Sequence, residues 1–351
     1  MPDCYGVVIT ALLAISASAE VRTAKVFGPE TATGPYKHPA SIAQLANGDL
    51  YLVYYGGGGE YALETAVFGA RRPRGSTRWT QPAPIASDPF RSLGNAVVWQ
   101  APDGLVWLFY VVRYGDTWST SRIQVKISRD GAATWSDASL LALEAGMMVR
   151  NRPIVLPNGE YLLPVYHEMG EDREVVGAGS TSRFLRFDPK TKLWSPSGVI
   201  RSPKGNIQPA PALLGDGTLI AYCRRGGGYG PVTDGYIVQS ESRDNGLTWT
   251  EGKDSQFPNP NSAIDLLRLR TGPLMLFYNP SMTARTPLRV SISTDDGRSW
   301  PRSRDIGKGD NSFAYPFAIE KQDGGIAVVY TSNGRRQINL VEFEASDVTA
   351  R

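Results

Sequence analysis

Arginine, tyrosine, histidine and carboxylate side chains stand beside short apolar segments at several places in this sequence. Arg224 is the first of the two arginines in AYCRR, Arg285 is the second residue of ARTPLRV, and Tyr315 is the second residue of AYPFAI. An arginine presents a planar pair of donors to a carboxylate, whereas tyrosine, histidine and glutamate transfer protons or act as nucleophiles. Brought together, these residue types would bind an anion and perform proton transfer on it. Whether they meet depends on the elements that position them.

The remaining inventory excludes several kinds of site. The chain has only two histidines, His38 and His167, and two cysteines, Cys4 and Cys223. This is too few for a zinc site of the Cys/His type, so we expect neither a metal nor a cofactor. The net charge is only +3, and the positive charges alternate with Asp and Glu, which argues against a nucleic-acid partner.

The N-terminal residues predict export. Gly6–Ile15 is an apolar run too short to span a bilayer, and Ala17–Ala19 offers small residues for processing before Glu20. We therefore expect residues 1–19 to be a signal peptide. No later segment approaches eighteen consecutive apolar residues, so the sequence predicts a secreted or periplasmic protein that does not insert into a membrane. We expect it to be a monomer.

Two markers recur along the chain with the same period. Turns followed by alternating apolar strands contain glycines 52–58 residues apart, at Gly48, Gly104, Gly159, Gly217, Gly272 and Gly324. Tryptophans recur 51–59 residues apart, at Trp79, Trp135, Trp194, Trp249 and Trp300. Asn-Gly and Asp-Gly favour tight hairpin turns, and the alternation has the period of a half-buried strand.

These repeats predict an all-β, six-bladed β-propeller over residues 20–351. Each tryptophan should pack between adjacent sheets. The sixth unit (residues 311–344) contains only three expected strands, so the strand around Val21 to Phe27 should complete that blade and close the ring.

A sequence motif accompanies three of the tryptophans. SRDNGLTW (Ser242–Trp249) and STDDGRSW (Ser293–Trp300) fit the pattern S-x-D-x-G-x-[ST]-W, and SRDGAATW (Ser128–Trp135) fits it less well. In such a hairpin the Asp carboxylate accepts backbone N–H bonds, Gly adopts a positive φ, and Trp anchors the turn. This pattern is the Asp box, and the chain resembles the bacterial and plant sialidase-like group of the BNR/Asp-box superfamily. The box is expected to be structural and to lie away from the active site.

The resemblance implies roles for particular residues. In sialidases three arginines hold the substrate carboxylate, a tyrosine paired with a glutamate is the nucleophile, and an aspartate is the acid/base. Tyr315 matches the tyrosine, and Arg224 and Arg285 match the second and third arginines. Glu60, in a loop of the first blade, falls in the region of the acid/base.

Two positions depart from the sialidase pattern. Lys37-His38-Pro39 stands where the first arginine motif is expected, and Gln208 stands near the expected glutamate. A lysine is a point charge that cannot replace the arginine fork. A tyrosine with an ordinary pKa near 10 also needs a group to take its proton.

In a propeller the pocket forms where the innermost strands begin and where the loops between second and third strands converge. The strand candidates are His38, Asn95, Asn151, Arg152, Gln208, Asn261, Asp265 and Tyr315, and the loop candidates are Glu60, Arg113, His167, Glu168, Arg224 and Arg285. Among them we expect the catalytic residues to be Tyr315, Glu60, His38 and His167. We expect the substrate-binding residues to be Arg224, Arg285, Arg152, Asn151, Asn261 and Asp265. The alternatives are that the histidines are hydrogen-bonded strand ends and that Asn261 holds an inter-blade turn.

Three functions fit these residues. The first is an exo-acting glycoside hydrolase for an acidic, sialic-acid-like sugar, which uses Tyr315, Glu60 and the arginines. The second is a polysaccharide lyase on uronate chains, in which an arginine neutralises the carboxylate and Tyr or His abstracts the α-proton. The third is a glycan-binding propeller without turnover. An acidic glycan is the expected partner in all three.

Overall fold

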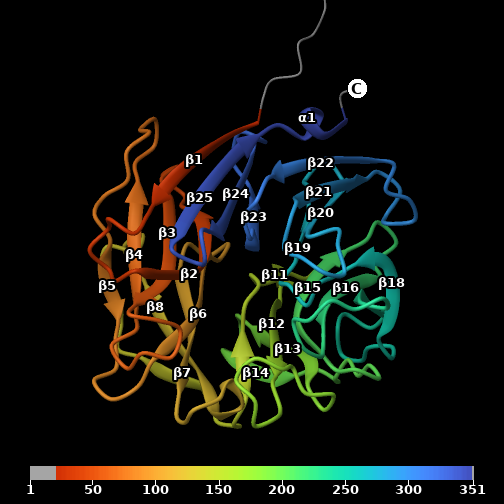
Figure 1. Ribbon diagram of the computed structural model, residues 1–351, viewed down its shortest axis with the longest axis horizontal. Coiled ribbons are helices and arrows are strands. Elements are labelled where there is room, and N and C mark those ends of the chain that lie inside the picture. Colours follow the sequence, from red (N-terminus) through yellow and green to blue (C-terminus); the bar gives the residue numbers. More distant parts are fainter. Residues whose placement is uncertain (1–20, 350–351) are drawn as a thin grey trace, which may run out of the picture.

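The computed structural model describes residues 21–349, and the predicted signal peptide lies outside this range. Within it, six antiparallel sheets are arranged in a ring (Figure 1), which confirms the predicted six-bladed β-propeller. Beyond the strands there are a short 3₁₀ turn, η1 (Trp118–Thr120), and one helical turn, α1 (Ala345–Thr349). Among the described residues no helix is long and apolar enough to cross a bilayer.

The blades follow one another along the chain. The strands of blades 1 to 3 are β2 (Tyr36–Gln44), β3 (Leu50–Gly57), β4 (Ala66–Arg72), β5 (Ala83–Ala86), β6 (Leu93–Gln100), β7 (Val106–Arg113), β8 (Ser121–Ser128), β9 (Ser139–Ala142), β10 (Met147–Val149), β11 (Ile154–Val155), β12 (Tyr161–His167), β13 (Thr181–Asp188) and β14 (Leu193–Pro196). Those of blades 4 to 6 are β15 (Asn206–Leu213), β16 (Leu219–Arg225), β17 (Tyr236–Ser242), β18 (Lys253–Pro258), β19 (Asp265–Arg268), β20 (Leu274–Tyr278), β21 (Leu288–Ser293), β22 (Arg302–Gly307), β23 (Ala314–Glu320), β24 (Ile326–Ser332), β25 (Gln337–Phe343) and β1 (Arg22–Phe27).

The N-terminal strand completes the sixth blade, as the sequence predicts. β1 pairs antiparallel with β25, with Thr23 opposite Val341 and Lys25 opposite Asn339. In Figure 1 β1, in red, lies beside β25, in blue. Strands from the two ends of the chain therefore share one sheet, with β1 as its outermost strand, and this pairing closes the ring.

The repeated tryptophans link each blade to the one before it. Trp249 of blade 4 stacks on Phe184 of blade 3, with ring centroids 4.5 Å apart. Trp135 of blade 2 lies 6.2 Å from the ring of Tyr51 in blade 1. The predicted packing of tryptophan between adjacent sheets is thus confirmed, and the aromatic contacts explain why the tryptophans share the period of the blades.

The Asp boxes form the expected hairpins. Asp244 accepts hydrogen bonds from the backbone and hydroxyl of Thr248 and from the Ser242 hydroxyl, which hold the pKa of its carboxyl at about 2. The box that fits the pattern less well, Ser128–Trp135, contains the same positive-φ position, because Ala132 takes a φ of 64° in place of the glycine. These turns join the third and fourth strands at the end of the ring opposite the loops that follow the second strands.

A backbone irregularity recurs in the innermost strands and positions the site. The pairing register slips by one residue in β6, β15 and β23, and Asn95, Gln208 and Tyr315 take positive φ angles of 43°, 57° and 57° there. A bulge of this kind turns a side chain out of the regular alternation. Since the three bulges occupy equivalent places in their blades, they direct three polar side chains toward one end of the ring.

Replacing Trp249 by Ala should lower the free energy of unfolding by about 3–5 kcal/mol, because it empties the contact with Phe184 between two blades. Trp249→Phe keeps an aromatic ring there and should cost less. Thermal unfolding measures both changes. A Trp249→Ala variant that retained its melting temperature but lost ligand binding would show that the box contributes to the pocket.

Candidate active site

Tyr315 lies at the centre of the group of side chains directed by the bulges. Its side chain is buried, and its hydroxyl oxygen lies 2.8 Å from Arg224 Nη1 and 3.4 Å from Gln208 Nε2. Both neighbours are donors, so the phenol oxygen acts as the acceptor in both contacts. Burial opposes ionisation of Tyr315, but Arg224, Arg285 and Arg335 outweigh it and lower the pKa of the phenol below its usual value.

Arg224 is held by neutral partners from three places. Its Nε donates to Asn261 Oδ1 at 2.6 Å, and its Nη2 donates to the Tyr229 hydroxyl at 3.1 Å. With Tyr315 these bonds use donors on all three guanidinium nitrogens of a buried arginine. Arg224 therefore keeps its charge beside Tyr315 and stabilises the phenolate form.

Arg285 contributes a second cation with free donors. Its Nη2 donates to the Asn261 backbone oxygen at 2.9 Å, and its guanidinium lies 4.9 Å from the centroid of the Tyr229 ring. Within residues 21–349 no carboxylate forms an ion pair with Arg285. Asn261, predicted to bind substrate, thus orients both predicted arginines, while Arg285 retains donors for an anionic ligand.

The sequence analysis missed a third arginine, Arg335. It lies in the turn between β24 and β25 with a φ of 65°, and its Nη1 forms an ion pair with Glu60 and a 3.2 Å hydrogen bond with the Tyr36 hydroxyl. The same Glu60 carboxylate accepts a 2.8 Å bond from Tyr36. The sequence contained a signal for Arg335. Asn333-Gly334 marks a turn after the second strand of the sixth blade, and the other loop candidates were taken from the equivalent loops of the other blades.

His38 packs directly against Tyr315. The two ring centroids are 4.2 Å apart at an interplanar angle of 76°, and His38 Nδ1 lies 2.8 Å from the Thr331 hydroxyl. Thr331 in turn donates to the Ala314 carbonyl at 3.2 Å, so His38 braces the residue preceding Tyr315. Burial and four surrounding arginines, Arg335, Arg285, Arg150 and Arg224, hold the pKa of His38 well below its usual value. The imidazole is therefore neutral and positions Tyr315.

Glu168 is a carboxyl group poised to exchange a proton. Desolvation raises its pKa to about 7, with Arg224 opposing the shift and Glu60 and Glu174 adding to it. The residue follows β12, whose Tyr166 reaches toward Asn95 at 2.9 Å. A carboxyl group that is partly protonated near neutral pH suits general acid/base catalysis.

Three sequence candidates lie outside this cluster or support it from behind. Arg152 Nη1 donates to both carboxylate oxygens of Asp265, at 2.8 and 3.1 Å, and Asp265 also accepts the Ala318 backbone N–H at 2.7 Å. Arg152 lines a cavity with Gln44 and Gln100, which lie at the far ends of inner strands from the Tyr315 cluster. Asn151 donates to the backbone oxygens of Gln208 and Pro209. These three residues therefore join neighbouring blades, and their predicted contact with substrate stays a prediction.

His167 and Lys37 also turn away from Tyr315. His167 Nδ1 lies 3.7 Å from Glu144, because neighbouring side chains of a strand point to opposite faces and Tyr166 takes the pocket face. Lys37 donates to the carbonyls of Gly34 and Thr31. The structure thus brings together Tyr315, His38, Glu60, Arg224, Arg285 and Asn261 among the sequence candidates, and it excludes His167 from that group.

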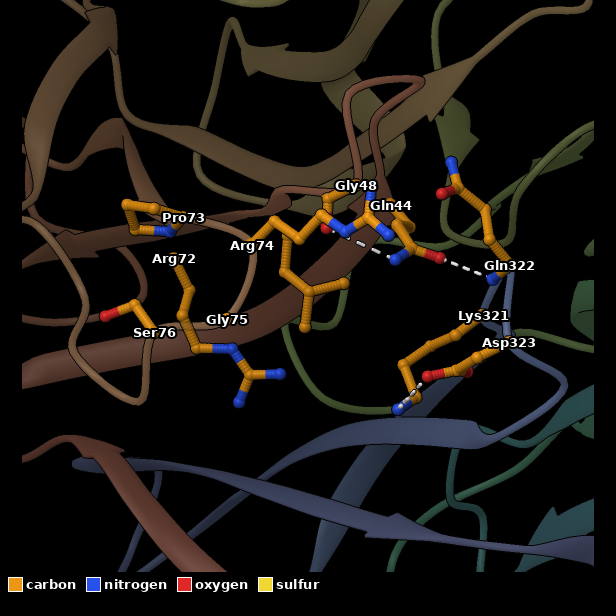
Figure 2. A pocket seen from close by; sticks show the side chains of 11 residues that line it. Gln44, Gly48, Arg72, Pro73, Arg74, Gly75, Ser76, Lys321, Gln322 and Asp323 are labelled. Atoms are coloured by element: carbon orange, nitrogen blue, oxygen red, sulfur yellow. Dashed lines mark hydrogen bonds and ion pairs between the residues drawn. The ribbon is translucent and has the colours of Figure 1, made fainter.

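A separate cavity of about 340 Å³ lies at the opposite end of the ring, between blades 1 and 6. Figure 2 shows Gln44 bonded to Gln322 and Lys321 paired with Asp323 in its lining. Arg72 in the same lining forms a bidentate pair with Glu342 at 2.7 and 2.8 Å. Arg72 and Lys321 both have carboxylate partners. We therefore infer that the residues lining this cavity join blades 1 and 6 and so help to close the ring.

The composition of the Tyr315 cluster defines what it can bind. Arg150, Arg224, Arg285 and Arg335 surround Tyr315 and His38, whereas Glu60 and Glu168 are the nearby carboxylates. No group of three or more His, Cys, Asp or Glu side chains in residues 21–349 could hold a metal ion. The arginine excess favours an anionic ligand beside a tyrosine of lowered pKa.

Comparison with solved structures gives the same fold in several sugar-processing enzymes. The Hadza microbial sialidase Hz136 aligns with a TM-score of 0.75 and 14% identity over 90% of this chain and 67% of its own. The Ruminococcus gnavus intramolecular trans-sialidase, solved with oseltamivir carboxylate, aligns with a TM-score of 0.75 and 13% identity over 93% and 98% of the two chains. The Fusarium graminearum α-L-arabinofuranosidase Arb93A aligns with a TM-score of 0.70 and 14% identity over 93% and 98%.

At these identities the likeness establishes the fold alone. No curated protein sequence matches the chain significantly. The sequence profile of the BNR repeat-like domain matches residues 48–328, which is well over half of the chain and includes all three Asp-box hairpins. The protein belongs to the BNR repeat-like domain family, and its fold is a six-bladed propeller.

Proposed function

We propose that this protein is an exported, exo-acting glycoside hydrolase for an acidic, sialic-acid-like glycan, with Tyr315 as its nucleophile. The observation that carries the proposal is the phenol oxygen of Tyr315, which accepts from Arg224 and Gln208 within a cluster of arginines that lowers its pKa. A tyrosine already biased toward the phenolate does not need the glutamate that Gln208 replaces. The likeness to sialidases supports the class of substrate.

The cluster supports a two-step reaction. The Tyr315 oxygen forms a bond to the anomeric carbon while the bond to the leaving oxygen breaks, and Glu168 gives its proton to that oxygen. Glu168, now a carboxylate, then takes a proton from a water molecule that attacks the anomeric carbon and releases Tyr315. Arg285 binds the sugar carboxylate through its free donors, and Arg224 stabilises the tyrosine oxygen as it leaves.

β-Elimination on a uronate chain is the second candidate. Within residues 21–349 no carboxylate bonds to the Tyr315 hydroxyl, which favours elimination, since an ionised tyrosine is also a base for the proton α to a carboxylate that Arg285 neutralises. Elimination creates a conjugated double bond that absorbs in the ultraviolet, whereas hydrolysis releases a fluorophore from a sialic-acid-like α-ketoside. Binding of the acidic glycan without either product would identify a binding propeller.

Tyr315→Phe should lower kcat by at least about a hundredfold, because it removes the reacting oxygen and leaves the ring in contact with His38. Initial rates on the α-ketoside measure the effect, and an unchanged melting temperature shows that folding is intact. Tyr278→Phe is the control, since it removes a buried hydroxyl bonded to Ser291 in blade 5. Full activity of Tyr315→Phe would refute the nucleophile assignment.

Arg285→Lys should weaken binding of an anionic sugar by about 1.5–3 kcal/mol, because the planar fork is lost while the charge stays. Binding of the methyl ester of the same sugar should change much less. Calorimetric titration of both ligands into the two proteins gives the comparison. Equal weakening for acid and ester would remove Arg285 from carboxylate recognition.

The rate should fall as the pH rises through about 7, because only protonated Glu168 can donate to the leaving oxygen and its raised pKa lies there. Glu168→Gln should remove this limb of the pH profile. It should slow an alkyl glycoside strongly and an aryl glycoside little, since a good leaving group needs no acid. A pH profile identical in both proteins would assign the proton to another group.

A further inference from the structure

Exposed apolar side chains gather on three loops of blades 1 and 2. Leu63, Phe90 and Tyr114 are 64%, 74% and 50% exposed, and they lie in the β3–β4, β5–β6 and β7–β8 connections. All three connections stand at the end of the ring where the bulges of the innermost strands occur. Backbone bonds tie them to one another, from Leu93 to Thr65 at 3.0 Å and from Arg113 to Ser92 at 3.1 Å.

Two arginines flank the exposed tyrosine. The guanidinium carbons of Arg91 and Arg122 lie 4.4 and 5.7 Å from the centroid of the Tyr114 ring. Arg91 has only a loose ion pair with Asp88, at 3.6 Å, and Arg122 donates to the backbone carbonyls of Thr120 and Ser121. Within residues 21–349 Arg122 has no carboxylate partner, so it can bind an anion that reaches Tyr114.

The same loops connect to the Tyr315 cluster. Tyr61 follows Glu60, its backbone oxygen accepts a 2.9 Å bond from Arg113, and its ring lies 5.6 Å from that of Trp118. Arg113 and Trp118 flank Tyr114 in the chain. Arg113 and Arg173 also lie 4.5 and 5.1 Å from the centroid of the Tyr61 ring, so Tyr61 joins the loop that carries Glu60 to the loop that carries Tyr114.

We propose that Leu63, Phe90, Arg91, Tyr114 and Arg122 form a second binding surface, the blade 1–2 platform, for further sugars of an acidic glycan chain. Sugar rings carry apolar faces that stack on exposed aromatic rings, and the two arginines complement carboxylates on successive units. The platform deepens the proposed function and rests on it for the class of ligand. The platform predicts that the ligand is a chain of several acidic sugars rather than a neutral glycan that ends in a single acidic sugar.

The experiment measures binding to the Tyr315→Phe protein, which should not turn the chain over. The probes are an oligosialate and an oligogalacturonate of about six sugars, each with its monosaccharide and its methyl-esterified form. We expect at least one acidic chain to bind about tenfold more tightly than its monosaccharide, roughly the effect of one well-placed charged contact. Esterification of that chain should remove the gain.

Tyr114→Ala and Arg122→Gln, each added to Tyr315→Phe, should abolish the chain-length gain and leave monosaccharide binding unchanged. Arg298→Gln is the matched control, because this exposed arginine lies in an Asp-box turn at the opposite end of the ring. No chain-length gain, a gain that survives both platform variants, or an equal gain for the ester would each overturn the platform. If the platform results hold while the unmutated protein neither hydrolyses nor eliminates, the proposed reaction fails and the binding surface stands.

Discussion

The burial of Arg224 is the constraint on which the site depends. A guanidinium removed from water must keep partners for its donors, and here Asn261, Tyr315 and Tyr229 provide them. Asn261 and Tyr315 occupy positive-φ positions in blades 5 and 6, and Tyr229 lies in a loop of blade 4. The buried contact between the Arg224 guanidinium and the Tyr315 phenol therefore forms only when three blades are assembled.

The same constraint explains why neutral groups surround so many cations. His38 is neutral, Gln208 is an amide, and Asn261 contacts Arg224 through its side chain and Arg285 through its backbone. A carboxylate at position 208 would pair with Arg224 and compete with Tyr315 for its donors. Substitution of glutamine for the expected glutamate is consistent with a tyrosine stabilised as an anion by arginines. Under the proposed function, this departure from the sialidase pattern changes how the phenol loses its proton and leaves the place of the tyrosine unchanged.

The Tyr315 cluster and the Asp boxes lie at opposite ends of the ring, so the residues that stabilise the fold are separate from those of the candidate site. The boxes lie at one end of blades 2, 4 and 5, where tryptophans such as Trp249 and Trp135 pack on the preceding sheet. The candidate site residues lie at the other end, on bulges and on loops after the second strands. Repetition of the tryptophan contact joins neighbouring sheets, and variation at the opposite end supplies different side chains from different blades.

The sequence by itself determined the fold, because its signals are local. A turn glycine and an alternating strand recur in all six units, and a tryptophan recurs in five of them, which is the pattern of a six-bladed ring. It also identified Tyr315, Arg224 and Arg285, whose places in the repeat can be counted. Tertiary structure alone decided that Arg335 joins them, since it enters through contacts with Glu60 and Tyr36 of blade 1, and that burial raises the pKa of the loop candidate Glu168.

The depth of a residue in the ring and the direction of its side chain likewise follow only from the tertiary structure. Arg152 and Asp265 stand near the start of inner strands in the sequence. Each further residue of an extended strand moves a side chain about 3.3 Å along the ring axis. The two residues therefore pair with each other farther along the ring than the Tyr315 cluster. His167 and Tyr166 are neighbours, but the pleat sends one to Glu144 and the other to Asn95. A repeat fixes which blade a residue belongs to, whereas the bulges and the pleat fix which way its side chain points.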